Sequence, residues 1–567
     1  MVTRLRRDAF LIPADQGARI LTNSGTESLT GPTIYQWIDK LAPYLDGRRS
    51  VAELTRPLPD EKRGMVERIV ATLLERGLIR HGAEDPHNGE VGYLDSFVPK
   101  AHETYRNYRH ARICVLGSGP LHTALVEVLV RSGADPRTGI RPEGELVIHL
   151  VDEADHGRGI AKECRRLGIP LVQAIPLGEE LWVYAGSDAV SAWRRLDRWS
   201  NVDDPVHQSP PPEAVAVAAS MVGQAAFRLL TGVAAPAEAT TMTCLHLVSL
   251  RTSTHRFLPL PDTVARTDRE AFLATMARLD TAPPLDPDSL DTEGSALRDA
   301  RIGVLGELSE RDYVQLPLNV TAATVAGRAR PVLGAGLSVT QARWQAVLAG
   351  IAAHAVSTMD HGQVWARRLA DGTARLVDAA AVFTARNVGA VARYSWSEAV
   401  SAGLFECTAM HTAAHPGPVT RLDPMALDHD EQAGAYRTIL RILEVPLEIY
   451  DVTGPLRAPT LAFRAGQRTI TYVSAPRPAD ALADGLRAVA LDEQSRRNGQ
   501  PDYAPPEVPQ LVVTNTRTGE PPASVTEPEV IDAMVAHGLD PVVVPLNHDP
   551  EVGRIMPFVA RVVILDD

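Results

Sequence analysis

The sequence predicts a mixed α/β protein made of several domains, and three observations support that fold class. The chain has 567 residues, and at about 150 residues per domain this length suggests three or four domains. Turn-forming, acidic stretches at residues 83–90 and 280–288 have the composition of linkers. Between them, short strand-like runs alternate with longer segments of helical apolar spacing. We therefore expect domains at residues 1–88, 105–275 and 285–567.

Composition and charge exclude several classes of function. Hydrophobic residues make up 45% of the chain and charged residues 22%, which is ordinary for a globular protein. The 57 basic and 70 acidic side chains give a net charge of −13, which argues against non-specific binding to nucleic acid or to a membrane. No Gly-Lys-Ser or Gly-Lys-Thr occurs, so a P-loop ATPase is excluded. Sparse cysteines and the lack of a long apolar run predict a cytoplasmic protein without disulfides or a membrane span.

The first block has the element order of a winged helix. Ser50 and Glu53 have the spacing of a capping box, and Gly77 ends the third helix. The expected strands are residues 9–13, 18–22, 26–30 and 78–79. The expected helices are residues 33–41, 51–54 and 60–76, and the turn at residues 46–47 ends the first helical segment. Through Glu90 the block carries 13 basic and 13 acidic residues, so it lacks the basic face that DNA phosphates require.

This block resembles the PqqD-like recognition element of ribosomally synthesised and modified peptides (RiPPs). The resemblance rests on residues 10–13, 45–47, 50–54 and 73–79. It implies that a leader peptide adds a strand to the third strand and packs on the third helix. The residues so assigned are Thr26, Glu27 and Leu29 on the strand, and Met65, Ile69 and Leu73 on the helix. A winged helix that binds no peptide is the alternative.

The middle block begins like a Rossmann fold, with a buried strand at residues 112–116 and a turn containing Gly117 and Gly119. His122 stands where the third glycine of a dinucleotide fingerprint belongs, which argues against a nicotinamide cofactor. Further strands are expected at residues 145–151 and 168–172, and helices at residues 123–130 and 214–230.

This order resembles the ThiF-type fold of adenylating enzymes, in the reduced form found in azole-peptide biosynthesis. Members of that family often hold zinc between two cysteine pairs. Residues 191–194 and 259–263 occupy the corresponding places here and contain no cysteine. The resemblance therefore implies a scaffold without zinc, and makes adenylation by this block a weak alternative.

The third block resembles YcaO proteins, which use ATP to turn backbone amides into azolines. A Gly-x-Gly turn leads into a helix at residues 333–354, and helices follow at residues 397–411 and 479–497, with closing strands at residues 538–545 and 557–564. Of the family's nucleotide-binding positions, Glu406 and Gln494 keep polar residues, which we interpret as relics on the helix surface. The other positions hold Ala349, Ala352, Ala353, Ala409, Met410 and His411.

Magnesium and triphosphate need several oxygen ligands at fixed spacing, and a single remaining carboxylate does not supply them. The resemblance thus implies a YcaO fold without catalytic residues, metal or cofactor of its own. We expect a leader-binding, catalytically silent partner of a separate ATP- and Mg²⁺-dependent YcaO cyclodehydratase that forms thiazolines and oxazolines in a thiopeptide-type precursor. An azoline dehydrogenase and a second copy of the chain are further candidate partners.

Two alternatives remain from the sequence. The chain could itself be a cyclodehydratase that uses ATP through a rearranged site. His411 and His415 also have the i, i+4 spacing of metal ligands, although no third ligand lies near them in sequence.

Overall fold

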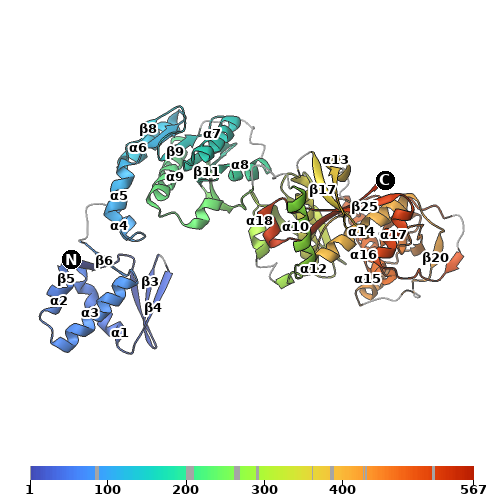
Figure 1. Cartoon of the computed structure of the whole chain (residues 1–567), viewed down its shortest axis with the longest axis horizontal. Coiled ribbons are helices and arrows are strands. Elements are labelled where there is room, and N and C mark those ends of the chain that lie inside the picture. The colour runs from blue at the N-terminus through green and yellow to red at the C-terminus, as the bar shows by residue number, and fades with distance from the viewer. Residues whose placement is uncertain are drawn as a thin grey trace. The chain divides into compact units, whose positions relative to one another are not determined.

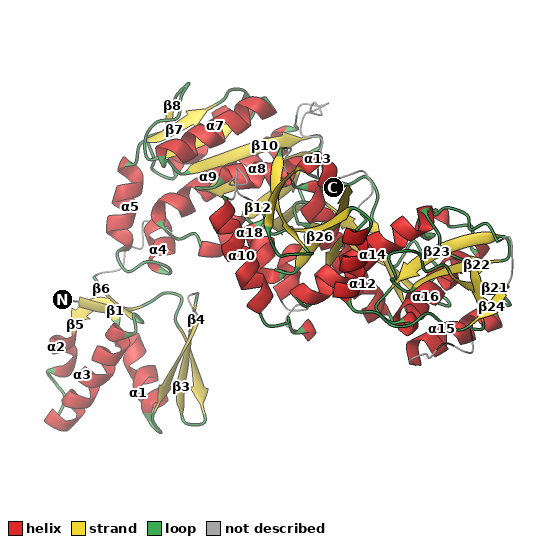
Figure 2. Ribbon diagram, turned by 45° about the vertical axis from the view of Figure 1, so that its right-hand side comes forward, coloured by secondary structure: helices red, strands yellow, loops and turns green. Residues whose placement is uncertain are grey.

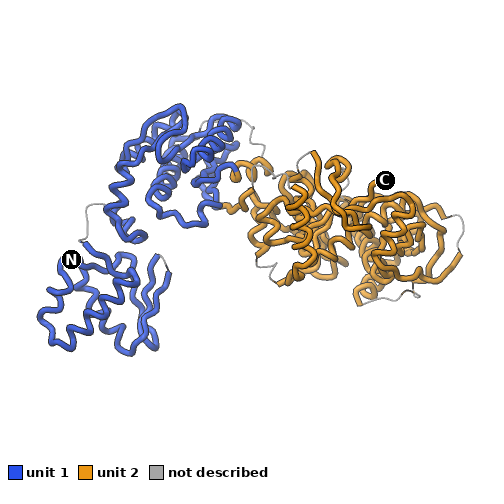
Figure 3. The backbone as a smooth tube through the Cα atoms, in the orientation of Figure 1, with its two compact units in different colours: residues 1–190, 202–254 blue, residues 191–201, 255–567 orange. Residues whose placement is uncertain are grey.

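The computed structural model divides the chain into two compact units, which Figure 3 colours separately. Unit 1 comprises residues 1–190 and 202–254, and unit 2 comprises residues 191–201 and 255–567. The residues that the structure describes are 2–23, 25–82, 89–199, 210–260, 268–288, 293–359, 362–383, 388–424, 427, 431–513 and 517–566. Most of the first predicted linker, residues 83–88, lies outside them.

The N-terminal part of unit 1 contains two small antiparallel sheets, of order β5-β1-β6 and β2-β3-β4, and three helices. Its elements are β1 (Val2–Leu5), β2 (Phe10–Ala14), β3 (Gly17–Thr22), β4 (Gly25–Thr30), α1 (Ile34–Leu41), β5 (Asp46–Ser50), α2 (Val51–Thr55), α3 (Asp60–Glu75) and β6 (Ile79–His81). The predicted helices, strands and Ser50–Glu53 capping box are confirmed. The sequence missed β1 and β5, because these short, charged strands have no apolar alternation and depend on partners distant in sequence.

The rest of unit 1 is built on a seven-stranded sheet of order β13-β12-β11-β10-β9-β7-β8. Its elements are α4 (Gly89–Asp95), α5 (Ala101–His110), β7 (Ile113–Leu116), α6 (Pro120–Arg131), β8 (Arg137–Thr138), β9 (Leu146–Leu150), α7 (Ala154–Leu167), β10 (Leu171–Leu177), β11 (Glu180–Gly186), α9 (Pro212–Thr231), β12 (Thr241–His246) and β13 (Thr252–Arg256). Strands β8, β7, β9 and β10 are parallel, as expected of a Rossmann-like start, whereas β11 and β12 are antiparallel.

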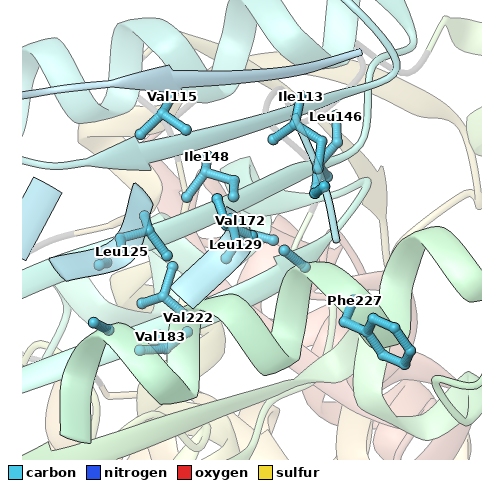
Figure 4. Packing of buried hydrophobic residues seen from close by; sticks show 14 of the residues in the cluster. Ile113, Val115, Leu125, Leu129, Leu146, Ile148, Val172, Val183, Val222 and Phe227 are labelled. Atoms are coloured by element: carbon cyan, nitrogen blue, oxygen red, sulfur yellow. The ribbon is translucent and has the colours of Figure 1, made fainter. Parts of the chain in front are cut away.

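Side chains of α6 and α9 cover apolar residues of β7, β9 and β10 to form the core of this part (Figure 4). Leu125, Leu129 and Val222 are fully buried against Val115 and Ile148. Helix α9 is the one described helix that is long and apolar enough to cross a membrane by length and composition. Its place in this core accounts for its apolar character.

Unit 2 contains a five-stranded sheet of order β18-β17-β25-β26-β19, a three-stranded sheet β14-β15-β16 and a second five-stranded sheet β23-β22-β21-β20-β24. Its strands are β14 (Leu305–Ser309), β15 (Asn319–Val325), β16 (Val332–Gly336), β17 (Gln363–Arg368), β18 (Ala374–Asp378), β19 (Ala390–Ala392), β20 (Thr420–Leu422), β21 (Leu447–Asp451), β22 (Thr460–Ala465), β23 (Arg468–Ser474), β24 (Arg517–Gly519), β25 (Leu539–Pro545) and β26 (Val559–Asp566).

The helices of unit 2 pack on these sheets, and Figure 2 shows α15 and α16 beside the second five-stranded sheet. They are α8 (Ala189–Asp197, in this unit from Ser191), α10 (Arg269–Thr281), α12 (Val339–Ser357), α13 (Ala379–Val382), α14 (Trp396–Ala414), α15 (Glu431–Ile442), α16 (Pro478–Arg497), α17 (Glu527–Ala536) and α18 (Pro550–Ile555). The three predicted helices and both closing strands of the third block are confirmed as α12, α14, α16, β25 and β26.

One local prediction in this block is wrong. The Gly-x-Gly segment, expected to be a turn, forms the end of strand β16. Its glycines serve close packing, since a Cβ on Gly334 would lie 2.1 Å from the carbonyl oxygen of Ala342 on α12. The helix itself begins after Ser338, whose side chain accepts a hydrogen bond from the backbone of Gln341.

Candidate functional site

Strand β4 is an edge of the β2-β3-β4 sheet and pairs only with β3 among the described residues (Figure 1). The register pairs Thr22 with Gly25 across the hairpin and Arg19 with Ser28 further along. In an antiparallel ladder, alternate residues direct both backbone groups toward the partner strand, beginning with the pair that flanks a two-residue loop. The backbone groups of Thr26, Ser28 and Thr30 therefore point away from β3 and are available to an added strand.

A contact of Arg76 supports this assignment of outward-facing groups. Arg76, directly after α3, donates a hydrogen bond of 2.8 Å to the carbonyl oxygen of Ser28. It also pairs with the carboxylate of Glu27 at 3.2 Å, with both side chains largely open to solvent. Arg76 thus joins the end of α3 to the free edge of β4.

The six predicted peptide-binding residues fall into two groups. Thr26 and Met65 are exposed, and Glu27 is half-buried, so these three can contact a ligand. The other three, Leu29, Ile69 and Leu73, are 7%, 5% and 0% exposed and belong to the core of this part of unit 1. Sequence reasoning missed Ser28, Thr30 and Arg76. The hairpin spacing could have identified the two strand residues, whereas nothing in the sequence indicates the contact of Arg76 with the edge.

The alanines of α12 lie in two different environments. Ala352 and Ala353 are 3% and 5% exposed and belong to an apolar cluster that includes Val325 and Val559. Ala349 is exposed. A carboxylate at either buried position would be surrounded by hydrocarbon, which strongly opposes ionisation.

The second predicted group lies on α14. Ala409 is 5% exposed, and Met410 and His411 are half-buried. Glu406 keeps contact with solvent. Surrounding protein nevertheless raises the pKa of its carboxyl, and a backbone hydrogen bond from Gly389 and the charges of Arg393 and Arg561 only partly oppose that rise.

Gln494 is not on the helix surface, and the interpretation of it as a surface relic is wrong. The residue is 1% exposed, and its amide is fully occupied. Its oxygen accepts a hydrogen bond from Leu318 N, and its nitrogen donates to the carbonyls of Val314 and Leu318. Gln494 therefore fixes the loop before β15 and has no group left for a nucleotide.

These positions do not fit Mg²⁺-ATP. Two alanines are in the core, Gln494 is saturated by backbone groups, and Glu406 is the one carboxylate among the eight predicted positions. Magnesium requires several oxygen ligands in octahedral geometry. The arrangement can hold a fold together, but it supplies no set of ligands for a metal triphosphate.

The two segments that correspond to the zinc-binding cysteine pairs do lie together. Ser191 Oγ donates to the carbonyl of Leu260 at 2.9 Å, and Leu260 N lies 3.1 Å from the same Oγ. Nearby, Arg195 donates to the carbonyl of Leu258 at 2.8 Å. These hydrogen bonds connect α8 to the following chain without thiolates, so the site does not fit zinc. Residues 261–263 lie outside the described residues.

A buried ionic cluster holds α8, α12 and α18 together in unit 2. Arg195 Nη2 lies 2.9 Å from Asp549 Oδ2, and His354 Nε2 lies 3.5 Å from the same oxygen. Burial raises the pKa of Asp549, but His354 and Arg195 outweigh it and lower that pKa to about 2. Burial lowers the pKa of His354 to about 4, so its imidazole is neutral at pH 7.

Two further pairs of histidines lie close together among the described residues. His411 and His415 have ring centroids 5.1 Å apart, and no third metal-binding group joins them among the described residues. In unit 1, His149, Asp152 and His156 have ligand atoms within 4.8 Å of one another. Gln173 Nε2, however, donates to His149 Nδ1 at 3.1 Å and to the carbonyl of Gly157 at 2.9 Å. This places the imidazole proton on Nε2, so His149 is a poor metal ligand.

The turn after β7 has the backbone that the sequence predicts. Gly117 and Gly119 have φ angles of 112° and 91°, and α6 begins at Pro120. A Cβ on Gly117 would lie 2.8 Å from the carbonyl oxygen of Leu150, so glycine is required by both conformation and space.

Comparison with solved structures shows the fold of the whole chain. The structure described as "Heterocyclase in complex with substrate and Cofactor" matches with a TM-score of 0.67 and 13% identity, over 99% of this chain and 94% of that chain. The heterocyclase TruD matches with a TM-score of 0.63 and 13% identity over the same shares. A structure of MccB from E. coli, with ATP, covers 45% of this chain and 97% of that chain, with a TM-score of 0.33 and 11% identity.

No protein-family model matches the sequence, and the search of curated proteins gives no match. The two heterocyclase matches nevertheless extend over nearly the full length of both chains. They confirm the mixed α/β, multidomain fold that the sequence predicts, and show that the chain has the fold of these heterocyclases.

Proposed function

We propose that this protein binds the leader of a ribosomally made precursor peptide and presents it to a separate, ATP-dependent enzyme that forms azolines. The observation that carries the proposal is a heterocyclase fold in which Ala352 and Ala353 are buried in hydrocarbon where nucleotide ligands are expected. The fold supports a scaffold, and two core alanines at expected ligand positions favour the absence of the oxygen ligands that ATP and Mg²⁺ need.

The edge of β4 is the proposed receptor for the leader. An extended peptide that pairs with Thr26, Ser28 and Thr30 would continue the sheet and place alternate side chains over Met65. The unpaired backbone groups of the edge supply affinity, and the exposed side chains supply selectivity. This mode agrees with the recognition element that the first block resembles.

Unit 2 is proposed to dock on the active YcaO enzyme. Binding of the precursor by one subunit and catalysis by another raises the effective concentration of the core peptide at the catalytic site. An azoline dehydrogenase and a second copy of the chain are further proposed partners. Four buried cysteines without disulfides are compatible with action in the cytoplasm.

Titration of the full chain with a fluorescently labelled leader of its precursor tests the receptor. The decisive variant is Ser28→Pro, because proline removes an N–H that points away from β3 and leaves the β3–β4 ladder intact. We expect this change to weaken binding about ten-fold or more, because it removes a ladder hydrogen bond and obstructs the edge. Ser28→Ala is the matched control and should bind like the wild type. Equal affinities for both variants would contradict strand addition at β4.

Phosphate release from ATP by the purified chain, with precursor present, tests the silent active site. We expect no release above background from the chain alone, and azoline formation only after a complete YcaO enzyme is added. Peptide-dependent ATP hydrolysis by the chain alone would instead support the alternative of a cyclodehydratase with a rearranged site.

A further inference from the structure

Unit 1 contains a buried cluster of three arginines and two aspartates among the residues that the structure describes. Arg4 makes a two-pronged ion pair with Asp95 at the end of α4. Arg6 makes another with Asp8, at 2.9 and 2.7 Å. Arg80, on β6, is 8% exposed, its side chain forms no ion pair with the part of the chain that the structure describes, and its Nε has no hydrogen-bond partner there. Each aspartate therefore serves one arginine, and Arg80 is the third cation.

A buried guanidinium without a partner is unfavourable. Burial and the charge of Arg6 lower the pKa of Arg80 below its usual range, and Asp95 and Asp8 only partly oppose them. Arginine keeps its proton at neutral pH even so, because its normal pKa is very high. The cost of this position would be offset by an anion that accepts hydrogen bonds from the free guanidinium.

Arg80 faces a cavity of about 870 Å³, a volume that accommodates a small organic ligand. The first residues of α5, Ala101, His102 and Glu103, line the same cavity. The N-cap residue of this ten-residue helix, Lys100, makes no side-chain capping bond, so the first amide N–H groups have no side-chain cap. Helix N-termini of this kind attract anions.

The remaining lining adds an exposed cation without a carboxylate partner among the described residues, and an apolar wall. Arg106, further along α5, lines the cavity and is exposed. Leu74, Ile79 and Pro99 provide apolar surface. Two carboxylates also line the cavity, and each has a cation beside it: Asp95 pairs with Arg4, and Glu103 pairs with Lys100. Arg80 and Arg106, the uncapped amides and the apolar side chains that remain are the features of a site for a phosphate attached to an organic group.

We propose that the cavity between β6 and α5 binds a small organic phosphate, with Arg80 as the buried partner of the phosphate oxygens. Arg106 is the solvent-side partner, and the first turn of α5 donates backbone hydrogen bonds. The site is separate from the edge of β4 and does not depend on the proposed leader binding.

Calorimetric titration of the full chain with AMP and with inorganic phosphate tests the site. We expect binding that Arg80→Gln weakens about ten-fold or more and that Arg106→Gln weakens less, because one partner is buried and the other exposed. Arg109→Gln, on the exposed side of the same helix, is the matched control and should bind like the wild type. Tighter binding of AMP than of phosphate identifies an organic phosphate as the ligand, and equal binding identifies free phosphate.

Thermal unfolding without ligand separates binding from a structural role. Because Arg80 is unpaired, Arg80→Gln should unfold at the same temperature as the wild type or higher, and phosphate should no longer stabilise it. A lower unfolding temperature together with unchanged phosphate affinity would overturn the proposal. Displacement of AMP by the leader peptide would also overturn it, since the cavity would then belong to the peptide site.

Discussion

The predicted sites of the two units differ in how far their polar groups are open to a ligand. In unit 1, β4 is the edge of its sheet, where Arg76 contacts the carbonyl of Ser28, and the guanidinium of Arg80 lines a cavity without an ion pair among the residues described. In unit 2, several of the positions expected to bind a nucleotide are buried: Ala352, Ala353 and Ala409 are in the interior, and Gln494 is saturated by backbone groups. These features support the proposal of a receptor in unit 1 and a scaffold in unit 2.

This difference bears on how a heterocyclase fold could exist without a nucleotide site. A fold survives the replacement of buried ligands by alanine, because small apolar residues pack without leaving a charge in the core. A carboxylate introduced at such a position is costly, since it enters hydrocarbon without a metal or other ligands to balance its charge. Recognition at an exposed strand edge carries no such penalty.

Restoring carboxylates on α12 should give the largest effect. Ala352→Glu and Ala353→Glu place a charge at positions 3% and 5% exposed, and each should lower the free energy of unfolding by about 3 kcal/mol or more. Ala349→Glu, on the exposed face of the same helix, should change it by less than about 0.5 kcal/mol. Denaturant unfolding measures all three. Buried variants as stable as the wild type and newly active with ATP would show that unit 2 retains a nucleotide site.

Acidification should weaken unit 2 through His354. Its pKa is lowered by burial to about 4 in the folded protein, against 6.5 for a free imidazole. The unfolded chain binds this proton first, so stability is lost as pH falls from 6.5 toward 4, by up to about 3 kcal/mol. His354→Gln keeps a donor toward Asp549 but cannot titrate, and should reduce the loss across this window. The measurement is unfolding by denaturant at a series of pH values.

The corresponding histidine substitution in unit 1 provides a comparison for that experiment. Burial also lowers the pKa of His149 to about 4, so the same window affects both units. His149→Gln and His354→Gln should each remove part of the acid sensitivity, and the double variant should remove the sum, because the two residues belong to different compact units. Unchanged pH dependence in both variants would show that these histidines are not the titrating groups.

The sequence predicted most of the regular elements and much less of their environment. Helices α12, α14 and α16 follow from apolar spacing, and the capping box at Ser50 identifies α2. Strands β1 and β5 do not, because their stability comes from pairing across more than 40 residues of chain. Which residues of the candidate site are buried could not be predicted from the sequence either. Nothing in the spacing distinguishes exposed Ala349 from buried Ala352, or indicates that Gln494 is fully occupied by the loop at Leu318.

Removal of the Arg76 side chain should give the smallest effect. This change tests the proposed leader-binding edge of β4 in unit 1. The carbonyl of Ser28 accepts from Arg76, so an added strand must displace this contact before it can pair there. Arg76→Ala should therefore tighten leader binding, by about two- to five-fold, since exposed contacts of this kind are worth about 0.2–1 kcal/mol. Arg56→Ala, exposed at the end of α2, changes charge equally and should leave the affinity unchanged. Weaker binding by the Arg76 variant would mean that this guanidinium holds the peptide itself, and that the edge of β4 is a charged clamp as well as a template for strand pairing.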